Sequence, residues 1–170
     1  MARHLVETAV NLIQAKIKAD IAGALSDIRI NRGDALVTTE QPQSYFITES
    51  AQGFRAPAIF IIPEEMNMSL DRGANHINAA IKINITVVVE DRDTTRLAIK
   101  AWRYQAALDQ VLQLQSLTSA DLAVTIKTKV DTALFGQIYT ASQEAGNTQG
   151  VFRKEVSLSL TVEHYEGYGG

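Results

Sequence analysis

The sequence has no cysteine in 170 residues, which excludes a disulfide scaffold, a thiolate nucleophile and metal sites built on sulfur. No apolar run approaches the roughly 18 residues that a membrane-spanning helix needs. Neither sign of charge dominates, because 16 Lys and Arg against 19 Asp and Glu give a net charge of −3. That balance argues against a general nucleic-acid binder. The remaining composition, 46% hydrophobic and 21% charged, is typical of a folded globular chain.

Motifs that carry chemistry are also missing. The sequence has no GxxxxGK[ST] phosphate loop, no GxGxxG dinucleotide turn and no GxSxG nucleophile elbow. Its three histidines, His4, His76 and His164, are far apart and lack the spacing of metal ligands. We therefore expect no catalytic residue, no cofactor and no metal site, and a protein that is not an enzyme.

The acidic residues leave one catalytic alternative open. The acidic pairs at residues 64–65 and 90–91 are adjacent, and neighbours in an extended chain point to opposite faces, which suits shared acid–base work poorly. Asp71 and Asp91 could still bracket a site if the chain between them folds back. A small α+β enzyme or ligand-binding domain that uses Asp71, Asp91 and His76 is therefore kept as an alternative.

Hydrophobic periodicity predicts two helices and one unusually long strand. Apolar residues recur at helical steps over residues 5–28 and again over residues 97–112, where Asp93 or Thr94 can cap the second helix. Between them, every second residue from Ile77 to Val89 is apolar, which is the period of a strand. At ~3.3 Å per residue this strand would span roughly 43 Å, about twice the usual length. We expect part of it to project as an arm or to pair with another subunit.

Shorter patterns complete the predicted fold. We expect a short strand between Pro42 and Gly53, a strand covered on both faces at residues 58–62, and later strands near residues 122–130 and 152–162. Residues 63–76 are expected to form an extended loop or hairpin arm. The prediction is a single α+β domain over residues 1–170: two amphipathic helices packed on a mostly antiparallel β-sheet, with a long strand or hairpin arm. Protruding loops are expected at residues 63–76 and 131–150.

One continuous stretch resembles a known family. Residues 81–93, IKINITVVVEDRD, are followed by Leu97-Ala98 and then by Trp102-Arg103-Tyr104-Gln105-Ala106-Ala107-Leu108. This stretch resembles the tail-terminator (tail-completion) proteins of tailed bacteriophages. In that family a long alternating strand ends in acidic turn residues, a helix with a Tyr and an Ala-Leu step follows, and paired strands close the sheet. The leading helix, the chain length and the final strand agree with this pattern.

The resemblance implies a structural role. It implies a ring, usually a hexamer, that sits on the last ring of a tail tube, ends tube polymerisation and offers a docking surface to the head connector. The implied partners are further copies of this chain, the tail tube protein and a head–tail connector or stopper, with no membrane. DNA would pass through the lumen without specific binding. The implied location is the tail or neck of a virion assembled in the host cytoplasm. Another ring-forming tail or neck component, such as a tube protein or stopper, is the close alternative.

Candidate partner contacts follow from the positions of charged and exposed residues. The acidic segments 63–76 and 131–150 are the expected contacts to the tube or the connector. Three basic residues are expected to match charges between subunits: Lys127, Lys129 and Arg153. The candidate interface residues are Glu64, Glu65, Met66, Met68, Asp71, Arg72, Lys127, Lys129, Asp131, Glu144 and Arg153.

Overall fold

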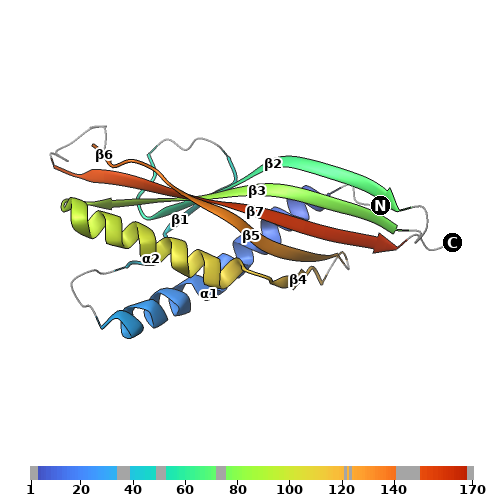
Figure 1. Cartoon of the computed structure of the whole chain (residues 1–170), viewed down its shortest axis with the longest axis horizontal. Helices are drawn as coiled ribbons and strands as arrows, with labels where there is room; N and C mark the ends of the chain where they lie inside the picture. Colours follow the sequence, from blue (N-terminus) through green and yellow to red (C-terminus); the bar gives the residue numbers. More distant parts are fainter. Residues whose placement is uncertain are drawn as a thin grey trace.

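A computed structural model describes residues 4–33, 39–48, 53–71, 76–120, 122, 124–140 and 150–167. Figure 1 shows an elongated molecule in which both helices lie along one side of a long, twisted sheet. The elements follow in the order α1 (Leu5–Arg32), β1 (Ser44–Phe46), β2 (Ala58–Asp71), β3 (His76–Asp91), α2 (Thr94–Leu112), β4 (Ser116–Thr118), β5 (Thr125–Phe135), β6 (Tyr139–Thr140) and β7 (Phe152–Gly167).

The sheet has the strand order β1-β2-β3-β7-β5-β4, and β6 pairs with β7. Only β1 and β2 run parallel, and every other pair is antiparallel. The predicted α+β class, with two helices on a mostly antiparallel sheet, is confirmed. The short strand β4 is an addition to the strands expected from the sequence.

Helix α1 is longer than expected because its stop signal is Gly33. The helix continues to Arg32 and ends where Gly33 adopts a left-handed conformation with φ of 61°. The Gly33 N–H donates to the carbonyls of Arg29 and Ile30, at 3.1 and 3.2 Å, which satisfies two carbonyls at the helix end. None of the described helices is both long and apolar enough to cross a membrane.

Two glycines of this helix should respond to alanine with opposite signs. Gly33→Ala forces a side chain into the left-handed region and should lower the free energy of unfolding by about 1 kcal/mol. Gly23 lies inside the helix, and an added Cβ would have nothing within 4 Å. Gly23→Ala should therefore raise the free energy of unfolding by up to about 1 kcal/mol. Urea denaturation of both variants measures the difference. Equal effects at the two sites would contradict the assigned helix end.

The core lies between the two helices and one face of the sheet. Every expected apolar position of α2 is buried, including Tyr104 at 1% and Leu108 at 0% exposure. Asp93 caps this helix through its side chain, which accepts from the Arg96 N–H at 2.8 Å. A second, smaller cluster covers the opposite face of β2, where the rings of Phe46 and Phe54 lie 5.0 and 5.3 Å from the ring of Phe60. The expectation that residues 58–62 are covered on both faces is therefore confirmed.

Part of the long strand lies in a hairpin arm, as expected, but the expectation that it would not find partners along its whole length within the chain is wrong. β3 pairs with β2 from His76 to Val88 and with β7 along its whole length, His76 to Asp91. β7 can match it because it is also 16 residues long. β3 therefore has no free edge to offer to another subunit. If edge pairing between copies occurs, a different strand must supply it.

In their described residues, the two segments expected to protrude are mostly strand. Residues 63–71 continue β2 and pair with β3, so this segment is a hairpin arm over its described residues. Residues 131–135 extend β5, where a loop was expected. Residues 72–75 and 141–149, which hold Arg72 and Glu144, lie outside the described residues.

Candidate interaction surface

The hairpin arm carries exposed apolar side chains on its helix-facing side. We define the arm as residues 63–71 of β2, 76–82 of β3 and 161–167 of β7. Met66 and Met68 lie opposite the buried Ile81 and Ala79, so these side chains share the core-facing side of the sheet. Yet Met66, Met68 and Leu70 are 43%, 57% and 55% exposed. The arm therefore extends the core face of the sheet beyond the part that the helices cover.

The outer edge of the arm is unpaired within the described residues. β1 pairs with β2 only at residues 58–60, and no described strand continues along β2 from Ile61 to Asp71. Beside this edge lies a groove of about 400 Å³ between the first turns of α1 and β2. Its apolar lining comes from Leu5, Val6, Val10, Ile47, Pro63 and Met66. Ile47 follows directly after β1, so the groove lies where that strand leaves the edge of the sheet.

The acidic candidates of the arm already have partners within the chain. Glu64 accepts a hydrogen bond from Asn84 at 3.2 Å, and Glu65 lies 3.5 Å from Lys82. The hydrogen bond from Asn67 and the charge of Lys82 lower the pKa of Glu65. Asp71 ends β2, with its backbone paired to that of His76. These carboxylates lie on the arm, as expected, but their contribution to a partner contact remains a prediction.

The basic candidates are not gathered into one patch. Lys127 and Lys129 are exposed on the same face of β5, as their spacing predicted, and Lys129 lies 3.4 Å from Asp131. Arg153 lies ten positions along β7 from Glu163, the partner of Lys127 in the sheet register. Arg153 is therefore too far from Lys127 and Lys129 to form one charged patch with them. If all three residues match charges on a neighbouring subunit, they do so at separate places.

Arg153 belongs to a separate structural contact. It forms an ion pair with Glu90 on the neighbouring strand, and its guanidinium lies 5.0 Å from the centre of the Phe54 ring. Both charged side chains are mostly buried, with 23% and 28% exposed. Arg153 thus joins β7, β3 and the small aromatic cluster, which is a stabilising position rather than an open one.

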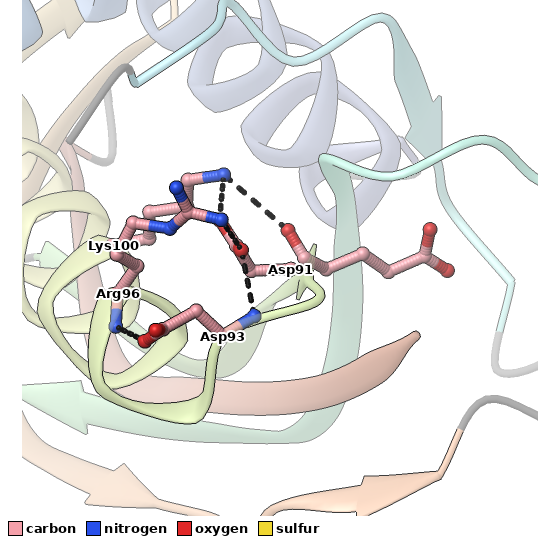
Figure 2. A network of polar contacts seen from close by, with 5 residues as sticks. Asp91, Asp93, Arg96 and Lys100 are labelled. Carbon is pink, nitrogen blue, oxygen red and sulfur yellow. Dashed lines mark hydrogen bonds and ion pairs between the residues drawn. The ribbon is translucent and has the colours of Figure 1, made fainter. Parts of the chain in front are cut away.

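Among the described residues, a cluster of charged side chains that sequence reasoning missed lies where β3 meets α2 (Figure 2). The Asp91 carboxylate lies 2.6 Å from Lys100 and 2.9 Å from Arg96, and it accepts from the Asp93 N–H at 2.9 Å. Burial alone would raise the pKa of Asp91, but the hydrogen bonds from Lys100, the Asp93 N–H and Arg96 outweigh it and lower the pKa to about 2. A carboxylate held ionised in this way is a poor general base near neutral pH. The network ties the start of α2 to the end of β3.

The catalytic alternative based on Asp71, His76 and Asp91 is wrong. Asp71 and His76 face each other at one end of β3, whereas Asp91 lies at the other end of this 16-residue strand. At ~3.3 Å per residue the separation is roughly 50 Å. Among the described residues, no group of three or more His, Asp or Glu side chains is placed to hold a metal ion.

Comparisons with known proteins give a likeness in structure but none in sequence. No protein-family profile matches the sequence, and no curated protein matches it significantly. Among solved structures, a chain of the "Virion of native gene transfer agent (GTA) particle" aligns with 13% sequence identity and a TM-score of 0.47. The alignment covers 89% of this chain and 97% of that chain. At this identity and TM-score, the likeness assigns neither a family nor a function.

Proposed function

We propose that this chain is a structural protein of a phage-like particle that forms a closed ring at the head-proximal end of a tail tube. In that position it would end tube polymerisation and present a docking surface to the head connector. The proposal rests first on the resemblance of residues 81–108 to tail-terminator proteins. The observed order of helices and strands agrees with the pattern that this resemblance implies.

One observation carries the proposal further. The arm exposes Met66, Met68 and Leu70 on an edge strand that has no partner within the described residues. Exposed apolar edge strands promote uncontrolled association in a monomer, and natural proteins usually cover or charge them. A protein that works as part of an assembly would cover such an edge with a neighbour. The net charge of −3 also suits a ring through which DNA passes without being held.

Light scattering and electron microscopy of the purified protein test this function. We expect rings whose mass is an integer multiple of the chain, a hexamer if the resemblance extends to ring order, and binding of these rings to the ends of tail tubes. Long cylinders without added tubes would instead indicate a tube protein. Rings that bind an isolated connector but not tube ends would indicate a stopper. A protein that stays monomeric at all concentrations and does not bind tube ends would contradict the proposal.

A further inference from the structure

Beyond its bulge, the free edge of β2 lacks the devices that normally protect such edges. Proteins guard edge strands with charges, prolines, bulges or covering segments. β2 has a proline at Pro63 and a bulge between Pro63 and Glu65, both near the middle of the strand. Beyond them, residues 66–70 read Met-Asn-Met-Ser-Leu, with no charge and no proline. This part of the edge is open to the addition of another strand.

The groove beside the edge would receive side chains from such a strand. Strand addition combines main-chain hydrogen bonds along the edge with pockets for alternate side chains. Met66 lies both on the edge strand and in the lining of the groove. A strand laid along β2 would therefore place every second side chain over Leu5, Val10 and Ile47.

The opposite edge of the same sheet offers a complementary strand. β4 covers β5 only at residues 125–127, and the Gln115 carbonyl and the Gln113 side chain accept the N–H groups of Thr128 and Val130. Residues 132–135 have no described partner on that side. Phe135 pairs with Val156 in the register, which places it on the helix-facing side of the sheet, yet it is 49% exposed. Phe135 lies outside the arm, because its register partner Val156 precedes the part of β7 that belongs to the arm.

We propose that the free edge of β2 receives the β5 edge of a second copy of this chain, with Phe135 of that copy seated in the groove. β2 and β5 run in opposite directions in the sheet, because β2–β3, β3–β7 and β7–β5 are all antiparallel. Two copies pointing the same way would thus join as an antiparallel pair with their helices on the same side. Glu65 has a counter-charge in Lys82, 3.5 Å away, and Glu64 accepts a hydrogen bond from Asn84, so both carboxylates are held within their own chain.

The same contact can repeat from copy to copy, because each chain carries both edges. Such a head-to-tail interface closes into a ring when its rotation allows and otherwise grows as a filament. The inference rests on the proposed function for the expectation of closure. A second copy is favoured over a foreign strand because residues 132–135 of this chain supply a strand edge with no described partner and an exposed aromatic residue on the required face.

Engineered cysteines test the contact directly, because the natural chain has none. Within one chain, Met66 and Phe135 are separated by three strand spacings and by about six positions along the strands, roughly 25 Å in all. A disulfide needs Cα atoms within about 7 Å, so the two positions cannot be joined within a chain. Oxidation of Met66→Cys/Phe135→Cys, with a short bis-maleimide in parallel, should give a ladder of covalent multimers that ends at the mass of the native particle.

Matched controls separate the possible outcomes. Either single-cysteine variant should give no species above a dimer, and Met66→Cys/Gln110→Cys, with its second position exposed on α2, should give no ladder. A further variant, Met68→Lys, places a charge on the edge and should weaken association about tenfold or more, while Asn78→Lys, which places the same charge on the other face of the arm, should leave it unchanged. Efficient dimers of Met66→Cys alone would contradict the head-to-tail arrangement. Cross-linking only to an added tube or connector protein would show a foreign strand at this edge and overturn the inference.

The inference and the proposed function fail in different ways. Rings that form normally but give no ladder, and that tolerate Met68→Lys, would overturn the β2–β5 contact and leave the proposed function standing. A persistent monomer with unpaired cysteines would overturn both. Filaments joined through the two cysteines would support the contact and contradict ring closure.

Discussion

Replacing Tyr104 by alanine is expected to lower the free energy of unfolding by about 3–5 kcal/mol, as for other large aromatic residues removed from a core. Tyr104 is 1% exposed on the inner face of α2. Its hydroxyl donates to the main-chain carbonyl of Glu40, which lies before β1. The residue therefore joins the second helix both to the core and to a segment 64 positions away in sequence. A loss of this size is a large fraction of the stability of a typical domain.

Chemical denaturation of two variants separates the contributions of the ring and the hydroxyl. Tyr104→Phe keeps the ring and removes the donor, so it should cost only about 1 kcal/mol. Gln110→Ala, on the exposed side of the same helix, should change the stability by less than about 0.5 kcal/mol. If Tyr104→Ala and Gln110→Ala had similar effects, the packing of α2 described here would be contradicted.

The local periodicities of the chain were sufficient to predict both helices and β3. In α2, residues such as Leu97, Leu108 and Leu112 recur at helical steps because the helix buries one face against the sheet. In β3 the strict alternation reflects one buried face along the full strand. A pattern of this kind shows that a strand has a buried face, but it does not identify the strands that pair with it. This is why the full pairing of β3 within the chain could not be predicted.

Bulges explain why two strand extensions were read as loops. In β2 the core-facing positions are odd-numbered up to Ile61 and even-numbered from Met66, because the bulge after Pro63 changes the phase. In β5 the same change occurs between Val130 and Ala133. An extra residue interrupts the alternation of inward and outward side chains, so a continuous strand looks like a strand followed by an irregular segment. A period of two resumes after each interruption, and this is the signal that could have revealed both extensions.

The candidate surface was predicted only in part, because exposure depends on contacts that are distant in sequence. Met66 and Met68 were identified as arm residues, but the free edge and the groove depend on where β1 ends and where α1 begins. Phe135 was not a candidate, since its exposure follows from the register of β5 against β7. The contacts of Asp91 were missed because their basic residues, Arg96 and Lys100, lie on a helix that starts only after the strand ends.

Asp91→Asn is expected to lower the free energy of unfolding at neutral pH by about 2–3 kcal/mol. It should also make the free energy of unfolding fall less steeply as the solution becomes acidic. The Asp91 side chain is 7% exposed and lies between Lys100 and Arg96, so the substitution leaves the 20% exposed Lys100 without its closest anion. The pKa of Asp91 falls from an ordinary 3.8 to about 2 in the folded protein. At about 1.4 kcal/mol per unit, this difference corresponds to about 2.5 kcal/mol of stability.

The sign of the pH dependence follows from the depressed pKa. Above about pH 5 the carboxylate is ionised in both folded and unfolded chains, and its contribution is fully present. As the pH falls towards 2 the unfolded chain takes up the proton first, so the contribution is lost between about pH 5 and pH 2. The wild-type protein should therefore lose stability more steeply than Asp91→Asn over this window, and the two curves should converge at its lower end.

Urea denaturation at a series of pH values between 2 and 7 measures this difference. Asp27→Asn removes the same charge from an exposed position on α1 and should follow the wild-type curve within about 0.5 kcal/mol. The cycle formed by Asp91→Asn, Lys100→Met and their combination should be strongly non-additive, because the second substitution removes a cation that the first has already left unpaired. Parallel curves for Asp91→Asn and the wild type would mean that another carboxylate controls acid stability, and an additive cycle would mean that the 2.6 Å contact contributes little. Convergent curves together with a non-additive cycle would identify the junction of β3 and α2 as the point where protonation loosens the helix layer from the sheet.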